Sequence, residues 1–61
     1  MQLIIDKKKY FFELGLLKMH GFINEDLMLT ELGMSNIEGI RNMLPQLQFI
    51  IDIERNELRI S

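Results

Sequence analysis

The side chains best suited to chemistry in this chain are a single histidine and two aspartates that each follow a pair of isoleucines. His20 has the chemistry of a general base, but the sequence around it offers none of the usual partners. Asp6 and Asp52 would form a paired-carboxylate site if their strands lay side by side. The alternative is structural, with His20 in the last turn of a helix and both aspartates at solvated strand ends. No residue cluster argues for catalysis, so we expect a protein that is not an enzyme and that uses no cofactor or metal.

Length and composition narrow the remaining possibilities. The 61 residues predict one small domain over 1–61, which buries only about 60% of the surface that its unfolded form exposes. The absence of cysteine excludes disulfides and cysteine-based metal sites. An apolar fraction of 48% is generous for so small an interior, so some apolar side chains are expected to face a partner. The net charge of −2 gives no overall attraction to nucleic acid or membrane, and the expected location is the cytoplasm.

The first part of the chain predicts a strand followed by a helix. Residues 2–6 are rich in isoleucine, which is typical of a strand. The lysines at positions 7, 8 and 9 form either a phosphate clamp or the solvated start of the next element. A helix is then expected over residues 10–20, ending at Gly21 as a left-handed cap, with an inward face made by Tyr10, Leu14 and Leu17 and with Phe11 beside them.

The opposite face of this predicted helix is also apolar. Phe12, Leu16 and Met19 point away from the inward face by roughly half a turn of the helical wheel. Leaving three large apolar groups in water forfeits roughly 1.5–3 kcal/mol for each of them compared with burial. We therefore expect Phe12, Leu16 and Met19 to bind a partner, either a second copy in a homodimer or another protein, because two-fold dimers are the commonest oligomers.

The middle of the chain predicts a second helix. Asn24 is a good N-cap, and Ile23 and Met28 fall at the two positions of a hydrophobic staple. We expect this helix to end near Leu32, with Gly33 as its C-cap.

A third helix is predicted directly after it. Ser35 and Glu38 match the capping box, in which a serine caps the helix and a glutamate three residues later reciprocates. The helix is expected over residues 36–44 and ends before Pro45, because proline lacks the backbone donor and clashes with the preceding turn.

The last part of the chain predicts a β-hairpin. Residues 48–54 and 58–60 alternate in polarity, and Arg55 and Asn56 mark the turn because asparagine tolerates a positive φ. If the first strand joins the hairpin, the sheet has three strands. The predicted fold is α+β, in the order strand, three helices and hairpin.

The stretch from Glu25 to Leu44 resembles the helix-turn-helix of bacterial and phage regulators. The likeness lies in the sequence 32–35, an apolar residue, a glycine, an apolar residue and a capping serine. With the hairpin, the resemblance covers residues 24–61 and implies a small winged-helix-like domain. In that family the third helix enters the major groove of DNA and the hairpin wing touches the backbone. The resemblance implies nucleic-acid contacts at Asn36, Glu38, Arg41, Asn42, Arg55, Asn56 and Arg59.

The same stretch also resembles an acyl carrier protein around its attachment site. That family shows leucine, glycine, an apolar residue, aspartate, serine and leucine, and the serine carries a phosphopantetheine arm. Ser35 stands at the aspartate position and Asn36 at the serine position, and an asparagine cannot carry that arm. We rank this resemblance below the winged helix.

Two functions are therefore expected from the sequence. The first is a small DNA-associated regulatory protein that binds double-stranded DNA through its helix-turn-helix and hairpin wing. The alternative is a protein–protein interaction module, an adaptor or an inhibitor, with the same fold and no DNA contact.

Overall fold

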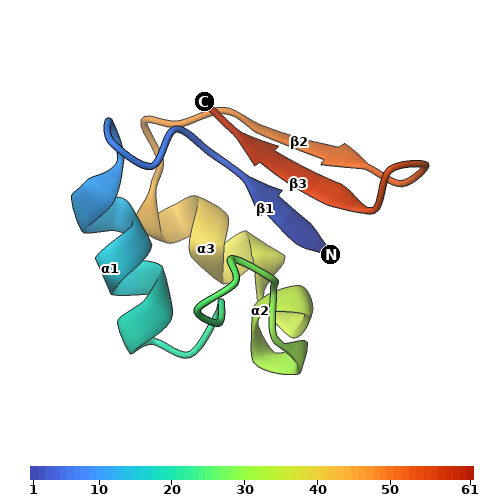
Figure 1. The fold of residues 1–61 in the computed structure, drawn as a ribbon, viewed down its shortest axis with the longest axis horizontal. Helices are drawn as coiled ribbons and strands as arrows, with labels where there is room; N and C mark the ends of the chain where they lie inside the picture. The colour runs from blue at the N-terminus through green and yellow to red at the C-terminus, as the bar shows by residue number, and fades with distance from the viewer.

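The computed structural model describes residues 1–61 and has the predicted order of elements. The chain forms three helices and three strands: β1 (Gln2–Ile4), α1 (Phe11–Met19), α2 (Glu31–Ser35), α3 (Ile37–Met43), β2 (Phe49–Asp52) and β3 (Glu57–Ile60). The helices lie against one face of the sheet, so the fold is a two-layer α+β arrangement (Figure 1). None of the three helices has the length and apolar composition that crossing a membrane requires.

The three-stranded sheet is mixed, with β3 at its centre. β2 and β3 form the predicted antiparallel hairpin, and Asn56 in its turn adopts a φ of +54°. β1 joins the other edge of β3 in parallel, with Leu3 opposite Leu58. Because side chains alternate along a strand, Leu58 and Ile60 face the helices while Arg59 between them faces solvent.

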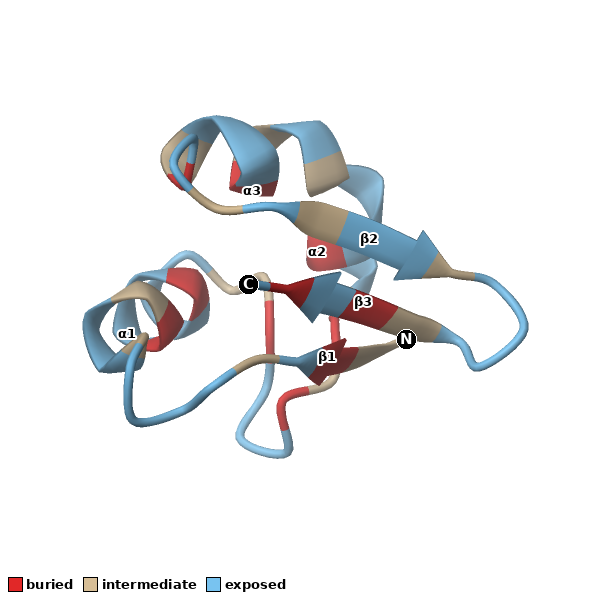
Figure 2. Ribbon diagram, turned by 90° about the horizontal axis from the view of Figure 1, so that it is seen from above, coloured by how far each residue is buried: buried red, intermediate tan, exposed pale blue.

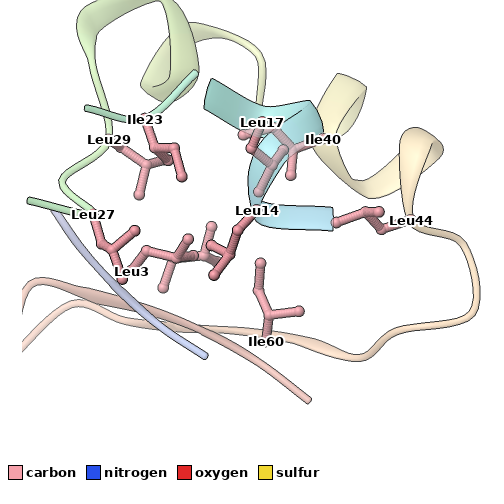
Figure 3. Close-up of a cluster of buried hydrophobic side chains, with 10 residues drawn as sticks. Leu3, Leu14, Leu17, Ile23, Leu27, Leu29, Ile40, Leu44 and Ile60 are labelled. Atoms are coloured by element: carbon pink, nitrogen blue, oxygen red, sulfur yellow. The ribbon is translucent and has the colours of Figure 1, made fainter. Parts of the chain in front are cut away.

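One hydrophobic core holds the two layers together. It is built by side chains from the sheet, from α1 and α3 and from the segment between α1 and α2, which meet in a single cluster (Figure 3). Its members are Leu3, Leu14, Leu17, Ile23, Leu27, Leu29, Ile40, Leu44, Leu58 and Ile60.

α1 confirms the prediction from helical spacing. Leu14 and Leu17 are its buried residues, and Gly21 follows with a φ of +77°. The N–H of Gly21 donates to the carbonyl of Lys18, and the N–H of Phe22 donates to the carbonyl of Leu17. This pair of bonds is the Schellman motif, which ends the helix and satisfies two of its last carbonyls.

The predicted second helix from Asn24 to Leu32 is wrong. Asn24 does accept backbone N–H groups with its side chain, from Asp26 and Met28, but it does so in a turn rather than at a helix start. Leu27 adopts a φ of +59°, which interrupts helical geometry. The carbonyl of Leu27 accepts the N–H of Leu3, so this segment pairs with the outer edge of β1 instead.

The predicted capping box at Ser35 and Glu38 is also wrong. Ser35 is the last residue of α2, and α3 begins at Ile37 with no side-chain cap. The residue that caps a helix here is Thr30, whose Oγ1 accepts the N–H of Gly33 at 3.1 Å. The same hydroxyl donates to the carbonyl of Gly21 at 2.5 Å. Thr30 therefore fastens the start of α2 to the end of α1.

Replacing Thr30 should destabilise the protein more than replacing Ser35. Thr30→Ala removes a helix cap and leaves the Gly21 carbonyl without its donor, for a combined loss of about 2 kcal/mol. Ser35→Ala removes an exposed hydroxyl that makes no hydrogen bond, so its urea midpoint should match the parent protein. Equal losses for the two variants would show that the third helix is capped by Ser35 after all.

Candidate functional site

The outer face of α1 is the most exposed apolar surface on the helices. We call it the α1 face, and its residues are Phe11, Phe12, Gly15, Leu16 and Met19. Phe12 is 82% exposed, Met19 74% and Phe11 72%. The buried residues of α1 lie on the side toward the sheet, and the exposed ones face outward (Figure 2). The predicted outward position of Phe12, Leu16 and Met19 is thus present, whereas the prediction that Phe11 faces inward is wrong.

A groove of about 730 Å³ runs along the α1 face. One wall is α1 itself, and the other is formed by Lys7, Glu25 and Leu27, which come from the segments before and after the helix. The apolar residues of the α1 face and the buried Leu14 provide most of the lining. The groove is therefore a hydrophobic trough with charged groups on its rim, which is the form that binds an amphipathic segment.

Gly15 lies at the midpoint of α1 and lines this groove. Apart from its chain neighbours and the backbone of its own helix, a methyl group on its Cα would meet no atom within 4 Å. A glycine inside a helix costs roughly 0.5–1 kcal/mol compared with alanine. Nothing inside the molecule therefore requires a glycine at this position.

The rim of the groove carries charges of both signs. Lys7 lies four residues before the start of α1. Glu25 lies at the other end of the helix, because its Oε2 is 3.8 Å from the Nζ of Lys18 in the last turn. The Glu25 side chain is 91% exposed and Lys18 is its partner in a surface ion pair, which holds it only weakly.

All three arginines predicted to touch DNA are paired with carboxylates of the same chain. Arg59 lies 3.1 Å from Glu57, and Arg55 lies 3.9 Å from Asp52. Arg41 lies 3.7 Å from Glu38 and also covers the ring of Phe49, with its guanidinium carbon 6.0 Å from the ring centre. Each arginine stands within three residues of its acid, so this pairing could have been anticipated from the sequence.

The predicted DNA contacts do not form one surface. Arg59 lies on the solvent face of the sheet, whereas α3 with Glu38 and Arg41 lies on the opposite, covered face (Figure 1). Arg55 and Asn56 are in the hairpin turn beyond the end of β2. The structure thus separates Glu38 and Arg41 from the predicted contacts of the hairpin. Within the hairpin, Asp52, the partner of Arg55, lies opposite Glu57, the partner of Arg59.

The predicted asparagine contacts have varied positions. Asn36 joins α2 to α3, and its side-chain amide donates to the carbonyl of Leu32 at 3.0 Å. The carbonyl of Asn56 accepts the N–H of Gln2 at 2.9 Å, which ties the hairpin turn to β1. Asn42 is exposed on α3.

The side chains singled out for chemistry do not meet. β3 lies between β1 and β2, so the strands that precede Asp6 and end at Asp52 are not neighbours and the condition for a paired-carboxylate site is not met. Asp6 instead accepts the N–H groups of Lys8 and Lys9 at 3.1 Å each. His20 stacks on the ring of Phe22, with ring centres 5.7 Å apart. No three acidic or histidine side chains come close enough together to hold a metal ion.

Sequence reasoning missed Gly15 and the second wall of the groove. Helical spacing places Gly15 between Phe12 and Met19, which was a usable signal. Glu25 and Leu27 had no such signal, because their position depends on the turn that replaces the predicted second helix. Comparison of the chain with protein-family models, with curated protein sequences and with solved structures finds no match.

Proposed function

We propose that this protein is a protein–protein interaction module that docks through the α1 face. The observation that carries the proposal is the exposure of Phe12 and Met19 beside a hydrophobic groove on a domain of only 61 residues. Soluble domains seldom leave contiguous apolar patches of this kind in water unless the patch binds something. Because the groove lies on a helix and not on an open sheet edge, its partner is expected to pack side chains into it.

The proposal places the activity in recognition and not in catalysis. The groove is lined mostly by aromatic and aliphatic side chains, and its charged residues, Lys7, Lys18 and Glu25, lie on its exposed rim. Aromatic and methionine side chains are enriched where proteins bind one another. An adaptor or an inhibitor fits these features better than an enzyme does.

The rival proposal is a DNA-associated regulator that uses α3 and the hairpin as a winged helix. The observed order of strand, three helices and hairpin supports it. Phosphate contacts provide most of the affinity for DNA, and here each arginine already faces a carboxylate. We therefore expect no binding to random duplex in a fluorescence-anisotropy titration at low salt. Binding to duplex that weakens steeply with added salt would overturn the interaction module as the proposed function and favour the DNA-associated regulator.

A photoreactive residue on the α1 face tests the proposed function. We expect p-benzoylphenylalanine in place of Phe12 to form a discrete protein adduct when illuminated in the cells that make the protein. Leu16→Glu in the same chain should abolish the adduct, because it places a charge in the apolar groove. The matched control carries the probe in place of Ile53, which is equally exposed at 85% but lies in the hairpin turn.

An adduct from position 12 that is absent from position 53 and sensitive to Leu16→Glu supports a docking surface on α1. The same weak, diffuse labelling from both positions would show that the α1 face is only an exposed surface and would overturn the proposed function.

A further inference from the structure

We infer that the occupant of the α1 face is a second copy of this chain, bound so that the two α1 helices cross antiparallel at Gly15. This inference rests on the proposed function and specifies its partner. Three observations lead to it: the unpacked glycine, the apolar groups on both sides of it, and the opposite charges of Lys7 and Glu25 on the rim of the groove.

The glycine marks the point of closest approach. Gly15 is the middle residue of the nine-residue helix, and a methyl group there would point into open space. The distance between packed helices is set by the side chains at their contact, so a glycine lets another helix come close at that point. A symmetric pair that crosses at the midpoint gives this glycine a role, because each Gly15 then lies against the backbone of the partner helix.

The two ends of the α1 face complement each other when the helices are antiparallel. Phe11 and Phe12 lie near the N-terminal end of α1, and Met19 lies at its C-terminal end. An antiparallel copy places the aromatic rings of one chain against the methionine of the other, on both sides of the crossing point. Methionine sulfur makes favourable contacts with aromatic rings, and a two-fold axis produces two equivalent contacts of this kind.

Charge selects the same orientation. Lys7 precedes α1 and lines the groove, while Glu25 lies beside Lys18 in the last turn of the helix. Antiparallel helices bring Lys7 of one copy toward Glu25 of the other. Parallel helices would instead place the two Lys7 side chains together, and like charges in such positions disfavour an interface.

Sedimentation equilibrium of the purified chain across the micromolar range tests the inference with three matched pairs of variants. The parent protein should sediment with twice the monomer mass of 7.3 kDa. Phe12→Glu should give monomers, whereas Ile53→Glu, with the same change at an equally exposed site, should leave the dimer intact.

The glycine and charge variants test the geometry. Gly15→Ala should weaken the dimer by about tenfold or more by adding a methyl group at the crossing point. Gly39→Ala makes the same exchange in α3, where the added methyl group meets only ordinary contacts, and should leave the mass unchanged. Glu25→Lys should weaken the dimer more than Glu54→Lys, which makes the same charge reversal in the exposed hairpin turn.

A parent protein that stays monomeric, or a dimer that survives both Phe12→Glu and Gly15→Ala, overturns the inference. A dimer broken by those two variants but indifferent to Glu25→Lys overturns the antiparallel orientation. A monomer whose position 12 still forms a specific adduct with another protein overturns this inference alone, whereas a monomer without such an adduct overturns the proposed function as well.

Discussion

Gly33→Ala is expected to lose about 3 kcal/mol of folding free energy or more, which is the cost of forcing extra volume into a packed site. A Cβ at this position would lie 2.0 Å from the carbonyl oxygen of Phe22 and 2.9 Å from its carbonyl carbon. Both are backbone atoms, and that oxygen also accepts the N–H of Thr30. The clash therefore cannot be relieved by rotating a side chain, and α2 must move away from the end of α1.

The matched control is Gly39→Ala, which exchanges the same residues on a neighbouring helix where there is room for a methyl group. It should gain roughly 0.5–1 kcal/mol, because alanine favours a helix interior over glycine. Urea denaturation followed by circular dichroism measures both variants. Total stability for a domain of this length is about 3–9 kcal/mol, so Gly33→Ala should be partly unfolded without denaturant. An unchanged urea midpoint would contradict the packing of α2 against Phe22.

Leu17→Ala is expected to lose about 3–5 kcal/mol, the range for deleting a fully buried leucine side chain. Leu17 is 0% exposed and belongs to the core cluster that α1 shares with the sheet. Leu32→Ala is the control, since Leu32 is half-exposed on α2 and should lose only about 1 kcal/mol. Similar urea midpoints for the two variants would mean that Leu17 is not buried in the core cluster.

The elements that sequence patterns predicted well are those with strong local signals. α1 followed from its apolar spacing and from Gly21, and both features act within one helix. The helix predicted for the segment from Asn24 to Leu29 was wrong because asparagine is favoured in turns as well as at helix caps. In this segment the turn forms, because the backbone pairs with the edge of β1, which lies more than twenty residues away in sequence.

Sequence patterns likewise predicted one part of the candidate site and missed another. The exposed positions of Phe12, Leu16 and Met19 followed from helical geometry, because residues on opposite sides of one helix cannot all face one core. The groove could not be predicted from helical geometry, since its second wall depends on Leu27 and Glu25, whose positions are set by tertiary contacts. Ser35 and Glu38 show the converse case, in which the capping-box pattern is present but the chain keeps Ser35 inside the preceding helix.

The most direct test of the central claim, that a second copy covers the α1 face, uses two methionine methyl groups as probes. In an isolated chain Met19 is more exposed than Met34 on α2, at 74% against 50%. Carbon-13-labelled methionine methyls relax faster when a soluble gadolinium chelate reaches them, so their relaxation reports exposure. In the purified protein at high micromolar concentration, we predict that Met19 is protected and that Met34 relaxes faster, which reverses the order set by one chain alone. Faster relaxation of Met19 than of Met34 at every concentration would contradict the claim.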